Sequence, residues 1–366
     1  MPGERDLKKR RLTVYDILFF EALGEEYHHL IEEIERAKKA GTLPAGLKYL
    51  VTPETLQAFL ESNPETELPE ILSIKTHSVL PEAWYANGPK KSVISRSAGY
   101  DHIEHLSGVI NATSLRRYCV NAVAETAVKF VFAACGNLNQ YQANMATFER
   151  NRCISFKELS NLKVTVFGVG KIGSRIYEIL KGIGMDAYAV DIRSEELSKE
   201  YGPGVRFIEK EESYDSDIIV CGMNYTKEPS SRFYNKNYFS DEFFSKCKPG
   251  LVFVNVTRGE ITDECALLKR IKDGSIFGLG LDAFAEEEEI TNVLKKGMEP
   301  KTALAAAQKE LVRLSVSREG NVYTQPHQAF NSDVAALDKA VETVKHLEAY
   351  YRNAGRCFDS QLPYYD

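Results

Sequence analysis

The sequence has 366 residues, more than one ordinary hydrophobic core needs and enough for two domains. Its hydrophobic content of 43% and charged content of 27% are typical of a soluble globular protein, and its net charge of −6 disfavours nucleic acid or a membrane surface as a partner. No apolar run approaches roughly 18 residues and no signal peptide is recognisable, so we expect neither a membrane span nor secretion. Seven scattered cysteines without a C-x-x-C pair predict reduced thiols in the cytoplasm and no metal site.

The N-terminal part of the chain alternates short apolar segments with helical patterns. Apolar segments predict strands at Leu12–Ile17, Leu47–Val51, Ile71–His77 and Lys91–Ser95. Apolar residues at helical spacing predict helices at Glu25–Ala40 and Glu54–Leu60. Strands that alternate with helices are typical of an α/β layer with a mostly parallel sheet, which we therefore expect here.

The segment Arg96–Asp101, Arg-Ser-Ala-Gly-Tyr-Asp, follows the last of these strands. Its small residues allow a sharp turn whose main-chain N–H groups point at an anion, as in a backbone nest. A plain strand-to-helix turn is the more common structure for such a local sequence. The anion site is therefore one of two open interpretations at this point.

A long helical pattern begins at Asn121 and is apolar on more than one side. Its apolar positions are Val123, Ala124, Ala127, Phe130, Val131 and Ala134. We expect this helix to lead from a first domain into a second and to pack against a large surface.

A glycine-rich turn follows the apolar strand expected at Lys163–Phe167. Gly168, Gly170 and Gly173 have the order G-x-G-x-x-G. In a dinucleotide-binding turn the first glycine permits the turn, the second lets the backbone approach a pyrophosphate, and the third allows close helix packing. The helix that begins near Lys171 would direct its N-terminal N–H groups at the phosphates.

The residues after this turn complete a βαβ unit. Ile172, Ile176, Ile179 and Leu180 form the apolar stripe of the helix, and a second strand is expected at Asp186–Val190. Asp191 follows that strand, 18 residues after the last glycine of the motif. A carboxylate at about this distance is typical of the group that binds the ribose hydroxyls of NAD. A βαβ unit without a ligand is the alternative.

Further short apolar segments predict the rest of a doubly wound sheet in this part of the chain. Strands are expected at Asp217–Cys221, Leu251–Val256, Phe277–Leu281 and Asn321–Tyr323, and helices at Asp241–Lys246 and Asp263–Asp273. Because ligands bind outside the carboxyl ends of such strands, polar residues that follow them are candidates for chemistry.

Three such residues stand out, and each also has an ordinary interpretation. Arg258 follows a buried-looking strand and has the planar fork that matches a carboxylate, but a lone arginine is most often a surface residue. Glu287 lies in a run of four glutamates that would ordinarily be a solvated loop, and His327 would ordinarily be structural. Their joint occurrence in a dinucleotide domain favours a catalytic site.

Taken in order, the motifs resemble those of the D-isomer-specific 2-hydroxyacid dehydrogenases, most closely the D-lactate dehydrogenase subgroup. The resemblance extends from about Leu12 to about Ala349. Its motifs are the substrate loop Arg96–Asp101, the hinge motif Tyr118–Glu125, the NAD fingerprint Gly168–Gly173 with Asp191 and Ile192, the arginine motif Val254–Gly259, the segment Gly280–Phe284, and Gln325–Phe330 with its Pro-His pair.

This resemblance implies a role for each matching residue. The catalytic residues would be Arg258, Glu287 and His327, and the substrate-binding residues Ala98, Gly99, Tyr118 and Phe330. The cofactor-binding residues would be Gly168, Gly170, Lys171, Ile172, Gly173, Asp191, Met223, Asn224, Thr257 and Asp282.

The sequence departs from the family pattern at several positions. Gln325 replaces a usual Thr, and Asn224 replaces a usual Pro. Val51 stands where several relatives carry an aromatic residue, which leads us to expect room for a longer substrate. Within the glutamate run 286–289 the catalytic acid would be Glu287, with its two neighbours as alternatives. The stretch 290–319 is longer than in typical members.

The resemblance and the residues together lead to one prediction. We expect two doubly wound parallel-sheet domains, Rossmann-like or flavodoxin-like, with a cleft between them: residues 1–120 with 330–366 for the substrate, and 121–329 for NAD. The function would be hydride transfer between NAD(H) and a small uncharged 2-oxo acid or D-2-hydroxy acid, since the substrate motifs contain no basic cluster beyond Arg96. An NAD-sensing binding protein or corepressor is the alternative, and a cytoplasmic homodimer is expected.

Overall fold

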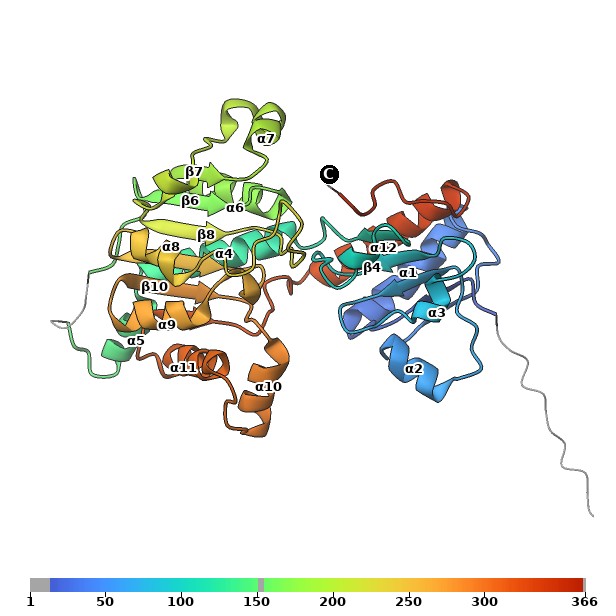
Figure 1. The fold of residues 1–366 in the computed structure, drawn as a ribbon, viewed down its shortest axis with the longest axis horizontal. Coiled ribbons are helices and arrows are strands. Elements are labelled where there is room, and N and C mark those ends of the chain that lie inside the picture. The colour runs from blue at the N-terminus through green and yellow to red at the C-terminus, as the bar shows by residue number, and fades with distance from the viewer. Residues whose placement is uncertain (1–13, 151–154, 365–366) are drawn as a thin grey trace, which may run out of the picture. The chain divides into compact units, whose positions relative to one another are not determined.

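The computed structural model describes residues 14–150 and 155–364. Within these ranges the chain forms two compact units (Figure 1). The first unit contains the residues up to Tyr118 together with those from Asp333 onward, and the second unit extends from Cys119 to Ser332. The C-terminal helix α12 (Ala335–Arg352), red in Figure 1, therefore belongs with the N-terminal elements drawn in blue.

The first unit is built on a five-stranded parallel sheet of order β2-β1-β3-β4-β5. The strands are β1 (Ile17–Phe19), β2 (Tyr49–Val51), β3 (Ile71–Ile74), β4 (Ser92–Ser95) and β5 (Asn111–Ser114). Besides α12, the helices are α1 (Glu25–Ala40), α2 (Leu56–Ser62), α3 (Glu82–Tyr85) and the 3₁₀ turn η1 (Glu104–Leu106).

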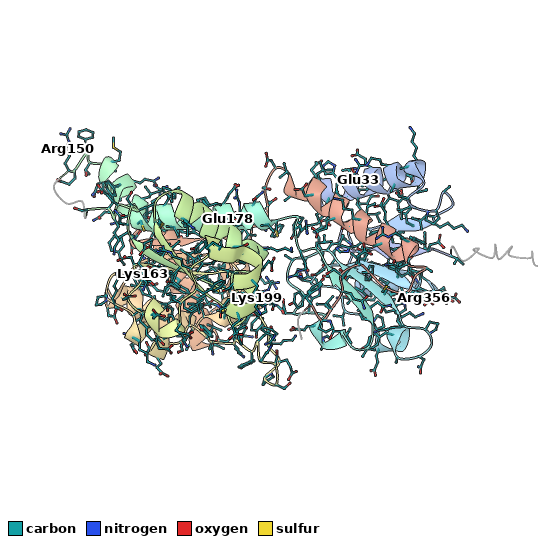
Figure 2. All side chains as sticks on the ribbon, turned by 90° about the horizontal axis from the view of Figure 1, so that it is seen from above. Glu33, Arg150, Lys163, Glu178, Lys199 and Arg356 are labelled. Carbon is teal, nitrogen blue, oxygen red and sulfur yellow. The ribbon has the colours of Figure 1, made fainter. Side chains whose placement is uncertain are left out.

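Helices cover both faces of this sheet, because successive strand residues point to opposite sides. Ile17 and Phe19 pack toward α1 and α12, which contact each other (Figure 2, where Glu33 marks α1). Leu18 and Phe20 pack on the opposite face with residues of α2 and α3. A parallel strand buried on both faces is an uninterrupted apolar run, as this one is.

The predicted opening strand Leu12–Ile17 is wrong and begins outside the described residues. Val14 is exposed, whereas the four residues from Ile17 to Phe20 are fully buried, so the strand lies further along the chain. The sequence also missed β5, because three of its four buried residues, Asn111, Thr113 and Ser114, are polar and give no apolar signal.

The third strand is shorter than expected, since it ends at Ile74 and not at His77. The reason is a tertiary contact. Oε1 of Glu21 accepts a hydrogen bond from the Lys75 N–H at 3.3 Å, and Oε2 accepts one from the His77 N–H at 3.2 Å. These amides therefore bind a side chain and do not continue the ladder.

The second unit contains a six-stranded sheet of order β11-β10-β9-β8-β6-β7, parallel throughout. Its strands are β6 (Lys163–Phe167), β7 (Asp186–Val190), β8 (Ile218–Cys221), β9 (Leu251–Asn255), β10 (Ile276–Leu281) and β11 (Val322–Thr324). Its α-helices are α4 (Val120–Cys135), α5 (Leu138–Met145), α6 (Lys171–Gly182), α7 (Ser194–Tyr201), α8 (Asp241–Lys246), α9 (Glu264–Lys272), α10 (Glu287–Lys296) and α11 (Ala303–Ser317). The 3₁₀ turns are η2 (Gly202–Gly204), η3 (Lys210–Ser213) and η4 (Gly259–Ile261).

Two groups of helices flank this sheet. Helices α4 and α6 contact each other and the central strands (Figure 2, where Glu178 marks α6), and α9 packs with α8 and α11 (Figure 1). Helix α4 lies very close to β10, because a Cβ at Gly280 would be 2.5 Å from the Phe130 Cβ and one at Gly278 would be 2.9 Å from the Ala134 Cβ. The long apolar helix expected from Asn121 is thus accounted for by its packing on the sheet.

The predicted fold class is confirmed, since both units are parallel-sheet α/β layers. The strands β6 and β7 and the helix α8 have the bounds that the sequence predicted. The long stretch 290–319 proves to be most of α10 and all of α11, two helices that the sequence analysis left without an account.

Within residues 14–150 and 155–364, no helix has the length and apolarity that a membrane span requires. Six of the seven cysteines lie in these ranges and are free thiols, and Cys153 lies outside them.

Candidate active site

The glycine-rich turn between β6 and α6 leaves no room for side chains at two of its three glycines. Gly168 has a φ of +78°, and a Cβ there would be 2.6 Å from the Met223 Cα. A Cβ at Gly173 would be 1.8 Å from the Gly168 carbonyl oxygen. These glycines permit the turn and the close approach of the helix, which are the roles expected of the first and third glycine.

The middle glycine behaves differently. A Cβ at Gly170 would meet no described atom within 4 Å, so packing inside the protein does not demand a glycine there. Gly170 caps α6, whose first residue is Lys171 and whose second is Ile172. Because Gly170 has no side chain, a pyrophosphate could approach the main chain closely at the N-terminus of α6.

Asp191 lies directly after β7 and faces the same turn. Its Oδ2 accepts a hydrogen bond from the Val169 N–H at 2.9 Å, and its Oδ1 accepts one from the Arg193 N–H at 2.9 Å. The Arg193 guanidinium pairs with Glu196 at 3.4 Å. The carboxylate is thus held beside the glycine turn, where a ribose-binding acid must lie, and the turn and Asp191 together fit a dinucleotide.

The other residues predicted to bind the cofactor lie at the ends of β8 and β9. Met223 packs against the Gly168 turn, and the Asn224 carbonyl accepts a hydrogen bond from the Asn235 side chain at 2.7 Å. The Thr257 N–H and hydroxyl both donate to Asn255 Oδ1 at 3.0 Å. All three residues therefore lie at the carboxyl edge of the sheet, where ligands bind in this type of fold.

Arg258 is held at the same edge by the buried amide of Asn255. The Asn255 Nδ2 donates to the Arg258 carbonyl at 2.8 Å, while the Arg258 guanidinium donates to the Thr257 carbonyl at 3.1 Å. Gly259 is indispensable to this turn, because a Cβ there would be 1.9 Å from the Ala285 nitrogen.

His327 has a φ of +52°, an uncommon conformation for a residue other than glycine. Its N–H donates to the Asp282 carbonyl at 2.6 Å. The Asp282 carboxylate in turn accepts hydrogen bonds from the Gln325 side chain at 2.6 Å and from the N–H groups of Gln328 and Ala329 at 2.9 and 3.0 Å. Asp282 is 1% exposed and holds the turn that presents His327, and Gln325 supplies one of its donors.

The three predicted catalytic side chains meet in this unit. His327 Nδ1 is 2.9 Å from Glu287 Oε1, and His327 Nε2 is 3.4 Å from Arg258 Nη1. Glu287 begins α10, and its Oε1 also accepts the Phe284 N–H at 3.4 Å. The imidazole therefore has one nitrogen on a carboxylate and the other directed toward a guanidinium.

The electrostatics of the site follow from these contacts. Burial acts to raise the pKa of Glu287, but the hydrogen bond and charge of His327 outweigh it and leave this pKa below its usual value. Burial raises the pKa of Asp282, and the donors from Gln325, Ala329 and Gln328 only partly oppose it. Near neutral pH, Glu287 is thus a carboxylate, and it lies against Nδ1 of His327.

The predicted substrate loop of the first unit follows β4. Ser97 Oγ donates to the Gly99 carbonyl at 2.7 Å and lies 2.9 Å from Ser95 Oγ, which also contacts His102 Nε2 at 3.0 Å. Among the described residues, no protein acceptor takes the N–H of Ala98 or Gly99. The loop is thus fixed by side chains, which leaves two neighbouring N–H groups for an anion.

Arg96, which begins that loop, is not a substrate-side cation. Its side chain is fully buried, with Nε 2.9 Å from Glu26 Oε1 and Nη1 2.9 Å from Ser73 Oγ. Lys75 and Lys339 pair with the other oxygen of Glu26, at 2.5 and 3.6 Å. The motifs alone did not reveal this cluster, because its members come from separate elements.

Two predicted substrate-side residues of the first unit have clear surroundings. The Lys339 ammonium lies 4.8 Å from the centre of the Tyr118 ring, and the Tyr118 N–H donates to Glu342 at 2.8 Å. Val51 is 6% exposed and packs in the core that faces α1 and α12. The expectation that Val51 leaves room for a longer substrate is therefore wrong, because its side chain points into the protein. Phe330, half-buried, lies in the second unit three residues after His327.

Sequence reasoning missed several residues that build the site. They are Asn255, Gly259, Glu264 and Gln308, of which the first three lie in or beside the arginine motif. A buried asparagine at the end of a strand and a glycine after the arginine were visible signals, whereas nothing local indicated that Gln308 contacts the same segment.

Fold and site together define a dinucleotide-dependent oxidoreductase. The family model described as "D-isomer specific 2-hydroxyacid dehydrogenase, NAD binding domain" matches residues 128–329, more than half of the chain. The chain belongs to this family, and its cofactor is NAD.

Similar proteins support this assignment. A D-lactate dehydrogenase of Lactobacillus delbrueckii subsp. bulgaricus is 27% identical over 91% of this chain and 97% of its own length. An aromatic 2-oxoacid reductase of Clostridium sporogenes is 27% identical over 71% of this chain and 75% of its own. The structure of the Aquifex aeolicus D-lactate dehydrogenase with NAD and lactic acid has a TM-score of 0.74 at 26% identity, covering 92% of this chain and 96% of that one.

Proposed function

We propose that the protein reduces a small 2-oxo acid with an uncharged side chain to the D-2-hydroxy acid, with NADH as the hydride donor. The observation that carries the proposal is the contact of His327 with Glu287 on one side and with Arg258 on the other. The names of the relatives, D-lactate dehydrogenase and aromatic 2-oxoacid reductase, support this substrate class.

Each group would have a distinct task in the reaction. The bound nicotinamide supplies the hydride. The Arg258 fork binds the substrate carboxylate and polarises the carbonyl. His327 gives its Nε2 proton to the carbonyl oxygen, while Glu287 holds Nδ1 and stabilises the imidazolium.

The test is a comparison of kcat/KM for pyruvate, 2-oxobutyrate, 2-oxoisocaproate, phenylpyruvate and oxaloacetate. We expect graded activity on the uncharged acids, because each methylene contributes only about 1–3 kcal/mol of discrimination. Best activity on oxaloacetate would contradict the uncharged side chain of the substrate. NADH binding without turnover of any acid would favour a binding protein instead.

The cofactor should be NADH rather than NADPH. The Asp191 carboxylate can accept hydrogen bonds from the ribose hydroxyls, and its charge repels a 2′-phosphate. The nearby cation Arg193, which could otherwise bind such a phosphate, forms an ion pair with Glu196. We expect a higher kcat/KM with NADH than with NADPH, and we expect Asp191→Ser to reduce the ratio of the two values. A preference of the wild-type protein for NADPH would contradict this assignment.

Glu287, and not a neighbouring glutamate, should set the pH profile. Glu287→Gln removes the carboxylate that favours the imidazolium, so kcat/KM for reduction should be lost at a lower pH than in the wild type. The same profile recorded for Glu286→Gln and Glu288→Gln is the matched control, since Glu286 precedes α10 and only Glu287 pairs with His327. An equal shift in either control would mean that the neighbour is the catalytic acid.

We also propose a homodimer that uses the second unit. Large apolar side chains are exposed on and around α5, namely Phe132, Leu138, Tyr141, Met145 and Phe148. Exposed apolar side chains that gather in one region favour association. Light scattering should give twice the chain mass, and Met145→Glu should lower it; a monomeric wild type would contradict the proposal.

The free thiols support a cytoplasmic location, which cell fractionation would test.

A further inference from the structure

Two buried polar residues lie behind the predicted catalytic residues without touching His327 or Arg258. Glu264 is the first residue of α9 and is 1% exposed, and Gln308, in α11, is fully buried. Nothing in the proposed chemistry uses either side chain. A carboxyl group is seldom placed in such surroundings without a specific task.

Both residues bind the main chain of Ala285, whose N–H and C=O groups are together called the Ala285 peptide below. Oε1 of Glu264 accepts the Ala285 N–H at 2.9 Å, and Nε2 of Gln308 lies 2.6 Å from both Oε2 of Glu264 and the Ala285 carbonyl oxygen. Only the NH₂ group can donate to two acceptors, which fixes the orientation of this amide. Its oxygen is left without a hydrogen bond among the described residues, so the two donated bonds decide the arrangement.

The Ala285 peptide lies between the two halves of the site. On one side it packs closely against Gly259, the residue after Arg258. A Cβ added at Gly259 would be 1.9 Å from the Ala285 nitrogen. On the other side the chain continues through Glu286, with a φ of +50°, into Glu287. A shift of Ala285 would therefore move the arginine turn and the start of α10 together.

We propose that Glu264 and Gln308 are positioning residues that clamp the Ala285 peptide and thereby hold Glu287 against His327. The inference rests on the proposed function, in which Glu287 orients the proton donor. It also gives α11, in the long stretch 290–319, a role in the active site. Gln308 is the residue through which this helix reaches the catalytic segment.

The electrostatics of Glu264 agree with a functional constraint. Burial raises its pKa to about 8, the bonds from Gln308 and Ala285 oppose this, and the charges of Glu260 and Glu287 add to it. A buried carboxyl near two other carboxylates does not favour folding, so its position needs another reason. Holding the Ala285 peptide supplies that reason.

The first test is Gln308→Met, which removes both donated bonds but keeps a similar volume and changes no charge. We expect kcat for 2-oxo acid reduction to fall on the order of 10-fold or more, because a misplacement of about 1 Å can cost about 10²-fold. NADH affinity should stay the same. The loss of kcat/KM with rising pH should shift to lower pH, as it should in Glu287→Gln. Lys309→Met, at the next and exposed position of α11, is the matched control and should behave like the wild type.

The decisive measurement is the double variant Gln308→Met with Glu287→Gln. If Gln308 acts through Glu287, Gln308→Met should change kcat less than about 2-fold in the Glu287→Gln background. Full, independent losses in the double variant would overturn the inference, as would a wild-type pH profile in Gln308→Met. If Glu287→Gln itself leaves the pH profile unchanged, the role proposed for Glu287 fails, and NADH binding without turnover of any 2-oxo acid would mean that the proposed function fails; both results are distinct from a failure of the clamp.

Glu264→Gln provides the second variant in case Gln308→Met does not fold. It keeps an acceptor for the Ala285 N–H, removes a buried ionisable group, and places a donor against the Gln308 NH₂. We expect a folded protein whose kcat falls in the same way with unchanged NADH affinity. A folded Glu264→Gln protein with wild-type kcat and pH profile would overturn the inference.

Discussion

Replacing His327 with Ala should lower kcat for 2-oxo acid reduction by about 10²–10⁴-fold, the usual contribution of a general acid. The physical reason is that Nδ1 is held by Glu287 at 2.9 Å, which leaves Nε2 as the proton-donating atom beside Arg258. NADH affinity should change little, because the side chains that hold the glycine turn are elsewhere. Steady-state kinetics and NADH fluorescence titration measure the two quantities separately.

The matched control for this variant is His105→Ala, an exposed histidine of η1 in the first unit. It should retain wild-type kinetics. Near-wild-type turnover in His327→Ala would mean that another group donates the proton. A loss of NADH binding in the same variant would mean that the turn held by Asp282 also shapes the cofactor site.

Replacing Arg258 with Lys should mainly weaken the binding of the 2-oxo acid. Lysine keeps the charge but loses the planar fork that binds a carboxylate through two parallel hydrogen bonds. A hydrogen bond to a charged group contributes about 1.5–3 kcal/mol, so we expect kcat/KM to fall by roughly 10–100-fold, mostly through KM.

Arg313→Lys is the control, since the partners of this exposed arginine among the described residues are Glu310 and Glu319 of the same region. It should leave KM unchanged. If Arg258→Lys lowers kcat at saturating substrate and leaves KM unchanged, Arg258 acts on the carbonyl in the transition state and does not anchor the carboxylate.

The sequence by itself determined the parts of the protein that depend on local chemistry. The alternation of strands and helices predicted the fold class, β6 and β7 have the predicted bounds, and α6 begins at Lys171 as expected. Gly168 and Gly173 were assigned correctly as a turn glycine and a close-packing glycine, because a G-x-G-x-x-G sequence after a strand has few other structures. Candidate catalytic residues were also visible, since strand ends are where such folds place their ligands.

Local patterns failed where a tertiary contact overrules them. The strand at Ile71 ends early because Glu21, distant in sequence, takes the amides that would have continued it. Val51 looked like a pocket residue, but the register of β2 turns its side chain into the core. Arg96 begins the predicted substrate loop, and its ion pair with Glu26 makes it a buried structural residue.

Only the tertiary structure decided which residues act together. In a run of four glutamates the sequence cannot say which one meets His327, because that depends on where α10 begins and on the positive φ of Glu286. The start of α10 depends in turn on the Ala285 peptide, which Glu264 and Gln308 reach from two other helices. Periodicity and turn chemistry act over a few residues, whereas a catalytic arrangement is set by hydrogen bonds and close packing between segments far apart in the chain.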